Sequence, residues 1–117
     1  MNKLTSLGTV SINIAGQSYM VSVNVGTYPD GSTLINLTKV DTKEVIAVIS
    51  EYRFGSTELP QHSFFGEHWC ATTGVTKQLV DLEVLAELQT VKYLDVYTLT
   101  QTALVILAAA QLPDLNK

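Results

Sequence analysis

The residues best suited to chemistry crowd into one stretch, residues 58–75, which holds the only Trp, the only Cys and both His residues. Within it His62, Glu67, His68 and Cys70 are all side-chain types that bind zinc. The spacing His-x4-Glu-His-x-Cys matches no common zinc pattern, however, and structural zinc sites usually take two or more Cys. We therefore expect neither a metal ion nor another cofactor.

Cys70 is also a candidate nucleophile, with His62 or His68 as its base. The fold brings such pairs together, so their nearness in sequence gives the pairing little support. A free Cys beside an aromatic residue such as Trp69 is more often a small buried hydrophobic residue. The main prediction is that the protein has no catalytic residue and is not an enzyme; a small Cys/His hydrolase or metal enzyme is kept as an alternative.

The apolar residues of the same stretch predict a structural role. Leu59, Phe64, Phe65 and Trp69 are expected to form a hydrophobic join between a sheet and a helix. The polar residues between them would then line a loop.

The chain before this stretch predicts four β-strands. Apolar and polar residues alternate over residues 10–14, 19–25 and 33–38, which is the period of half-buried strands. Turn residues separate these segments, and residues 45–49 are apolar on both faces, as in a central strand covered on both sides. Short connections predict an antiparallel meander.

The chain after Gly74 predicts helices and one more strand. Apolar residues at helical spacing predict a helix over residues 75–88, with Thr72 or Thr73 as its cap. A fifth strand is predicted over residues 90–99. A second helix is predicted from residue 103 to residue 111, ended by Pro113.

Two carboxylates of the predicted first helix are four residues apart. Glu83 and Glu87 would share one face of that helix. Paired carboxylates can act in acid–base catalysis, but a solvated helix face is the more common use of this pattern.

Composition bounds the class of protein. At 117 residues, with 46% hydrophobic and 15% charged residues, the chain predicts a single α+β domain over residues 1–117. We expect a four- to five-stranded, mainly antiparallel sheet with one or two helices packed on it. The net charge of −4 argues against direct binding of nucleic acid. No signal sequence is visible, and the longest apolar run, residues 103–110, is too short to cross a membrane, which predicts a cytoplasmic protein.

Several short motifs carry a family resemblance. They are Tyr28-Pro-Asp-Gly-Ser-Thr-Leu-Ile-Asn-Leu, Ile49-Ser50, Glu58-Leu-Pro-x-x-x-Phe-Phe-x-x-x-Trp and Gly74. With them the chain resembles a family of small uncharacterised proteins, a domain of unknown function, carried by bacteriophages, plasmids and other mobile elements. The resemblance covers roughly residues 10 to 85, and the tail from Thr90 shows no match. His68 stands where the family has a polar, often charged residue. No catalytic residue can be transferred, because the family has no agreed activity.

The resemblance implies an accessory protein of a mobile element, acting in the cytoplasm of the host cell. Such proteins often bind and block a host protein complex, so we expect an inhibitor of a host defence complex such as a CRISPR effector (anti-CRISPR-like) or a restriction enzyme. Acidic residues on turns and on the helix are the predicted partner-binding residues, since they could meet a basic groove on that complex. These residues are Asp30, Glu51, Glu58, Asp81 and Glu87.

The apolar C-terminal helix suggests an alternative function. Residues 103–111 carry no charge, so that helix is either buried in the fold or part of an interface. A virion structural or assembly protein, which forms a homo-oligomer through this helix, is therefore the second hypothesis.

Overall fold

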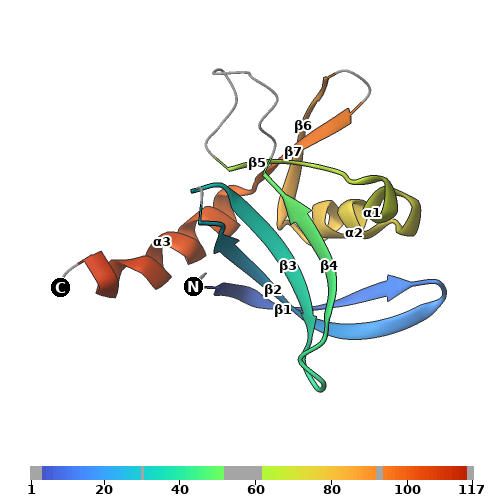
Figure 1. Ribbon diagram of the computed structural model, residues 1–117, viewed down its shortest axis with the longest axis horizontal. Coiled ribbons are helices and arrows are strands. Elements are labelled where there is room, and N and C mark those ends of the chain that lie inside the picture. The colour runs from blue at the N-terminus through green and yellow to red at the C-terminus, as the bar shows by residue number, and fades with distance from the viewer. Residues whose placement is uncertain (1–3, 30, 52–61, 92–93, 116–117) are drawn as a thin grey trace.

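The computed structural model describes residues 4–29, 31–51, 62–91 and 94–115, with backbone alone at residue 91 and residues 111–115. The fold is α+β, as predicted, with two antiparallel sheets and three helices (Figure 1). The first sheet has the order β1 (Thr5–Ile14), β2 (Gln17–Thr27), β3 (Thr33–Lys39) and β4 (Val45–Ser50). This arrangement confirms the predicted meander of the first four strands.

The second sheet is formed by the later part of the chain. Its order is β5 (Ser63–Phe65), β7 (Leu94–Leu99) and β6 (Leu85–Val91). The single fifth strand predicted over residues 90–99 corresponds to the end of β6 and to β7, which are two strands of a separate sheet. A bridge between Glu51 and Phe64 links the end of β4 to β5, so that the two sheets meet at this point.

Three helices complete the fold: α1 (His68–Thr73), α2 (Val75–Asp81) and α3 (Gln101–Leu115). Helix α2 contacts β1 and β6, each of which is an outer strand of its own sheet. Helix α3 packs on β1 and β7 through the buried residues Ala103 and Leu107, and then extends away from the sheets (Figure 1). No helix in the described ranges has the length and apolar character needed to span a bilayer.

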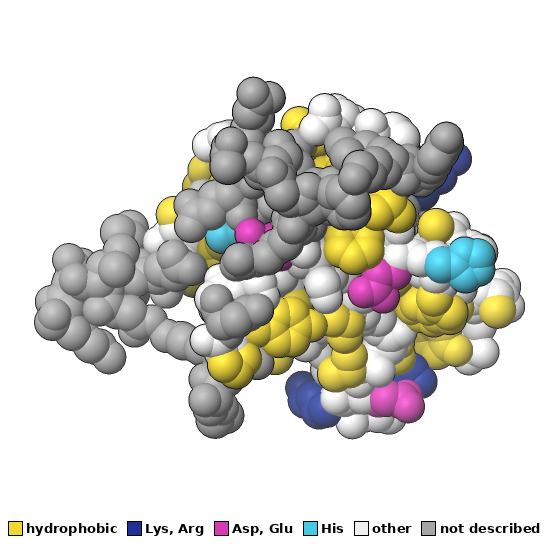
Figure 2. Space-filling view, turned by 45° about the horizontal axis from the view of Figure 1, so that its top comes forward, with side chains coloured by type: hydrophobic (Ala, Val, Ile, Leu, Met, Phe, Trp, Pro, Cys, Tyr) yellow, Lys and Arg dark blue, Asp and Glu magenta, His cyan; other side chains and the backbone are white. Residues whose placement is uncertain are grey.

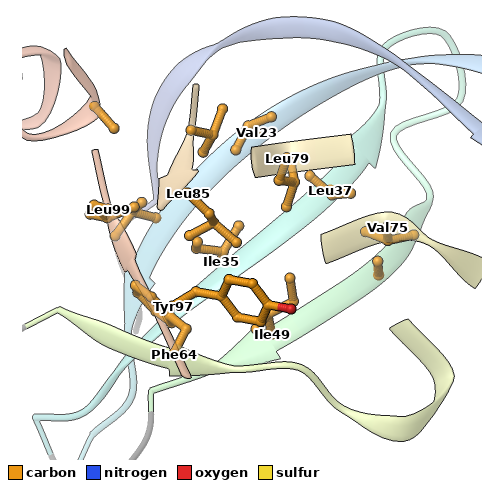
Figure 3. Packing of buried hydrophobic residues seen from close by; sticks show 14 of the residues in the cluster. Val23, Ile35, Leu37, Ile49, Phe64, Val75, Leu79, Leu85, Tyr97 and Leu99 are labelled. Carbon is orange, nitrogen blue, oxygen red and sulfur yellow. The ribbon is translucent and has the colours of Figure 1, made fainter. Parts of the chain in front are cut away.

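The core lies between the two sheets and α2, where the predicted apolar faces meet (Figure 3). Phe64 is fully buried there, which is worth about 1.5–3 kcal/mol relative to an exposed side chain. The labelled core residues are Val23, Ile35, Leu37 and Ile49 from the first sheet, Phe64, Leu85, Tyr97 and Leu99 from the second, and Val75 and Leu79 from α2.

The outer face of the first sheet carries a hydrogen-bonded polar row. Asn24 Nδ2 donates to Asn36 Oδ1 at 2.8 Å, and Thr38 Oγ1 donates to the same oxygen at 3.1 Å. Ser22 Oγ donates to Asn24 Oδ1 at 2.9 Å. Both Asn residues are buried, so these bonds offset the cost of removing two amides from water.

The predicted helix over residues 75–88 is wrong in its second half. Helix α2 ends at Asp81, and Glu83 turns the chain with a left-handed φ of 62°. The N–H groups of Glu83 and Val84 donate to the carbonyls of Val80 and Leu79, which satisfies the end of the helix. Beyond the turn, pairing with β7 overrides the helical spacing. Glu83 and Glu87 therefore do not share a helix face.

Three smaller predictions also fail. The strand over residues 45–49 is an outer strand of its sheet, with Val45 about half exposed. Neither Thr72 nor Thr73 caps α2, because Gly74 occupies the N-cap position and both Thr hydroxyls donate to carbonyls within α1. Helix α3 does not end at Pro113 but continues to Leu115.

Candidate functional site

The stretch rich in chemical side chains becomes β5, α1 and the start of α2. Strand β5 pairs with β7, and the chain then turns through Gly66 and Glu67 into α1. Gly74 ends α1 and starts α2 with a left-handed φ of 74°, a conformation that glycine adopts without steric cost. Residues 52–61, including Leu59 of the predicted hydrophobic join, lie outside the described residues.

The predicted join is formed only in part. Phe64 is fully buried in the core, and Phe65 is partly buried. Trp69 was expected to join them, but it lies on the outer side of α1 with 46% of its surface exposed. The inward position of that helix is taken by Cys70 instead.

Cys70 is a buried structural residue. Its side chain is fully buried, and Sγ lies 3.9 Å from the carbonyl oxygen of Val48 on β4. Burial, and to a smaller extent the carboxylate of Glu67, raises the pKa of the Cys70 thiol to about 11. A thiol with this pKa is protonated at neutral pH, which makes it a poor nucleophile.

The two His side chains are placed far apart. His68 is exposed at the start of α1, whereas His62 is partly buried beside β5, and Figure 2 shows the two imidazoles on opposite sides of one face. Within the described residues, no three His, Cys, Asp or Glu side chains lie close enough to share a metal ion. The residues proposed for zinc are therefore not brought together.

The predicted partner-binding carboxylates have different environments. Glu51 is partly buried, and its Oε2 accepts hydrogen bonds from the backbone N and the hydroxyl of Thr33 at 2.6 and 3.1 Å. Asp81 and Glu87 are exposed, at the end of α2 and on β6. Asp30 and Glu58 lie outside the described residues. The binding role of all five carboxylates stays a prediction.

A carboxylate that the sequence analysis did not select lies close to Glu87. In the β6–β7 pairing Glu87 is opposite Tyr97, and Asp95 precedes Tyr97 by two residues on the same strand. The side chains of Glu87, Asp95 and Tyr97 therefore stand on one face of the second sheet. Glu87 and Asp95 are both exposed, so this face has an acidic edge, which we define as these two residues.

A hollow of about 240 Å³ lies beside Asp95, between β7 and α1. The carbonyl of Asp95 accepts a hydrogen bond from the N–H of Gly66 at 3.2 Å, which holds the two chain segments together. The hollow is lined by Gly66, His68, Ala71, Leu94, Asp95 and Tyr97. Of these, only His68 was selected from the sequence.

Two larger hollows, of about 400 and 370 Å³, flank Lys39 on the first sheet. The Nζ of Lys39 lies 3.1 Å from the carboxylate of Glu44 and 4.7 Å from the ring centre of Tyr19. The charge of Lys39 is therefore already paired with Glu44, which weakens its attraction for an anion; the smaller of the two hollows is also lined by Lys43.

Helix α3 presents an apolar surface to the solvent. Ala103 and Leu107 are buried against the sheets, whereas Val105 and Ile106 are 57% and 39% exposed. The helix carries no charged residue from position 101 to position 111.

Comparisons with known proteins add no relative: no protein-family model, no curated protein and no solved structure matches this chain.

Proposed function

We propose that this chain is a non-enzymatic accessory protein of a phage or another mobile element, which binds a host defence complex and inhibits it. The observation that carries the proposal is the acidic edge, where Glu87 and Asp95 stand exposed on one face beside an open hollow. CRISPR effectors hold nucleic acid in positively charged channels, and restriction enzymes contact the phosphates of their DNA with Lys and Arg. Clustered carboxylates on a small protein can compete for such a groove.

Two further observations support a binding role. The only Cys is buried, and its raised pKa keeps the thiol protonated at neutral pH, so it is poorly suited to nucleophilic catalysis. The sequence resemblance to proteins of mobile elements supplies the context in which a host defence complex is the partner.

The proposal is tested by infection of host strains that carry a CRISPR effector or a restriction enzyme directed against a phage. Expression of the chain is expected to restore plaque formation by that phage. The double variant Glu87→Lys with Asp95→Lys is expected to lose the protection, because reversed charges repel a basic groove. This double variant, and the control variant described next, must give the circular dichroism spectrum of the original protein.

A matched control reverses two carboxylates elsewhere. Asp41 and Glu44 lie in the β3–β4 turn, at the opposite end of the molecule from the β6–β7 hairpin (Figure 1). The variant Asp41→Lys with Glu44→Lys changes the net charge equally and is expected to keep the protection. Absence of protection by the unmodified chain in all strains, or equal loss with both double variants, would overturn the proposal.

A second candidate function is that of an assembly protein, which the exposed apolar surface of α3 favours. Val105 and Ile106 would be covered by a second copy of the chain in a homo-oligomer. Light scattering after size exclusion separates the candidates. A large oligomer that the variant Val105→Glu with Ile106→Glu dissociates, and that the control Gln101→Glu leaves intact, would establish assembly; a monomeric chain would exclude it.

A further inference from the structure

We infer that the hollow beside Asp95 receives the side chain of one arginine of the partner protein. This inference rests on the proposed function, because it assigns the place where a basic surface of the partner is held.

Gly66 keeps the hollow open. A Cβ added at this position would lie 3.4 Å from Cε2 of Tyr97 and 3.6 Å from Cγ2 of Thr76. The backbone φ of Gly66 is not in the left-handed region, so the turn itself does not require glycine. The missing side chain therefore leaves space between Tyr97 and Thr76 rather than relieving backbone strain.

Two nearly buried hydroxyl groups next to Gly66 have no partner. Tyr97 is 8% and Thr76 is 3% exposed, and neither hydroxyl forms a hydrogen bond within the described residues. Of the two residues, Tyr97 lines the hollow, whereas Thr76 lies behind it, next to Gly66. Among the residues that the structure describes, His62 Nδ1 is the one side-chain nitrogen or oxygen atom that is fully buried and lacks a hydrogen-bond partner. Both hydroxyls therefore reach accessible space. Figure 3 shows the Tyr97 hydroxyl directed toward the side of the core where Val75 starts α2.

Such hydroxyls are suited to a ligand rich in donors. A hydroxyl that reaches accessible space can bond to water, and an N–H group of a ligand can replace that water without loss of the hydrogen bond. Arginine offers five N–H donors and no acceptor, so it can satisfy a carboxylate and hydroxyl oxygens at the same time.

The charge of the hollow favours a cation. The Oδ1 atom of Asp95 accepts a hydrogen bond from Thr90 Oγ1 at 2.9 Å, which orients the carboxylate. The lining residues include no Lys or Arg among those that the structure describes. Glu87 of the acidic edge does not line the hollow, but it lies on the same face of the sheet, opposite Tyr97.

The remaining walls are suited to an alkyl stem that ends in a planar cation. Leu94 and Ala71 line the hollow with apolar groups, against which the methylene groups of arginine can pack. Arginine fits this combination better than lysine, because its planar group binds a carboxylate through two hydrogen bonds and still has N–H donors for a hydroxyl oxygen.

The inference is tested on the isolated chain by NMR. Nα-acetyl-arginine-N-methylamide is titrated into ¹⁵N-labelled protein, with the acetylated norleucine amide as an uncharged probe of similar length. The arginine probe is expected to shift the amide signals of Gly66, Leu94 and Asp95 in a saturable manner, and the norleucine probe is not. Shifts of equal size with both probes, or no shifts, would overturn the inference.

Two variants and one control sharpen the test. Asp95→Asn keeps the shape of the side chain but removes its charge, and it is expected to weaken binding of the arginine probe about ten-fold or more. Gly66→Ala is expected to weaken it by filling the space. Asp41→Asn, in the distant turn, is expected to leave it unchanged. Retained affinity in Asp95→Asn, whose folding the same spectra verify, contradicts the assignment.

The NMR test is independent of the infection test. Binding of the arginine probe without protection of the phage would keep the hollow as an arginine site and reject the defence complex as partner. Protection without binding of the probe would reject the arginine site and leave the proposed function standing.

Discussion

The side-chain amide of Gln78 forms two hydrogen bonds with the backbone of Asn13. Asn13 N donates to Gln78 Oε1 at 2.7 Å, and Gln78 Nε2 donates to Asn13 O at 2.8 Å. Strand β1 is an outer strand of its sheet, so these backbone N–H and C=O groups have no neighbouring strand on that side. Gln78 thus acts in place of a strand, and it fixes α2 to the edge of the sheet.

We predict that Gln78→Met destabilises the protein by about 1–3 kcal/mol, because it keeps the length of the side chain but removes the two hydrogen bonds to Asn13 and a third to the carbonyl of Gly74. Urea unfolding followed by circular dichroism measures the change. The control Lys77→Met alters the adjacent exposed position of α2 and is expected to stay within about 0.5 kcal/mol of the original protein. Equal losses in both variants would show that the amide bonds contribute nothing specific.

A second prediction concerns the polar row on the outer face of the first sheet. Asn24→Ala removes the 2.8 Å bond to Asn36 Oδ1 and leaves a buried amide with fewer partners. We expect a loss of about 1–3 kcal/mol in the free energy of unfolding. Asn13→Ala, at an exposed position of β1, should change it by less than about 0.5 kcal/mol. A neutral Asn24→Ala would mean that the row is solvated.

The raised pKa of Cys70 predicts that the protein loses stability at high pH. The pKa of this thiol is about 11 in the folded protein, against a reference value of 9.0. Below pH 9 the thiol is neutral in both states; above it the unfolded chain releases the proton first, so stability falls as the pH rises from 9 to 11. The full effect is about 2–3 kcal/mol.

The variant Cys70→Ala isolates this effect from the titration of other groups. Unfolding free energies of the two proteins are compared between pH 8 and pH 11. The decline should be smaller in the variant by the contribution of the thiol, and parallel curves would show that Cys70 does not titrate differently on folding.

The backbone conformation of Gly74, at the junction of α1 and α2, predicts that its replacement lowers the free energy of unfolding. Gly74 has a left-handed φ of 74°, and an added Cβ would meet only Gln78 Nε2, at 3.9 Å. Gly74→Ala should therefore cost about 1–2 kcal/mol through backbone strain alone. Gly74→Asn should cost less, since Asn adopts this conformation more readily. A larger loss in the Asn variant would point to crowding instead of strain.

The sequence predicted the fold best where the neighbours in space are also neighbours in the chain. Strands β1 to β4 pair in chain order, so alternation and turn residues suffice to predict them. Residues 84–88 were predicted as helix because their apolar spacing is compatible with a helix. Their strand conformation depends on pairing with β7, and the spacing of apolar residues within the segment carries no information about that pairing.

The same limit applies to the site. Tyr97 and Asp95 were placed on a predicted strand, but their role depends on the register that sets Tyr97 opposite Glu87 and Phe64. Trp69 was expected to be buried because of its type, yet its position on α1 turns it outward while Cys70 faces the core. The space left by Gly66 could not be predicted from the sequence, since a glycine in a loop is ordinarily explained by the backbone conformation of a turn.

The two hydrogen bonds between Gln78 and Asn13 also have a consequence for the order of folding during synthesis. The two residues are 65 positions apart, so all residues of β1 are synthesised before Gln78, which covers the outer edge of that strand. At 5–20 residues per second, the ribosome needs roughly 3–13 seconds to supply Gln78 after Asn13. During that interval an uncharged strand edge is open to other chains. The rate of translation between these residues would therefore affect how much of the protein is recovered in soluble form.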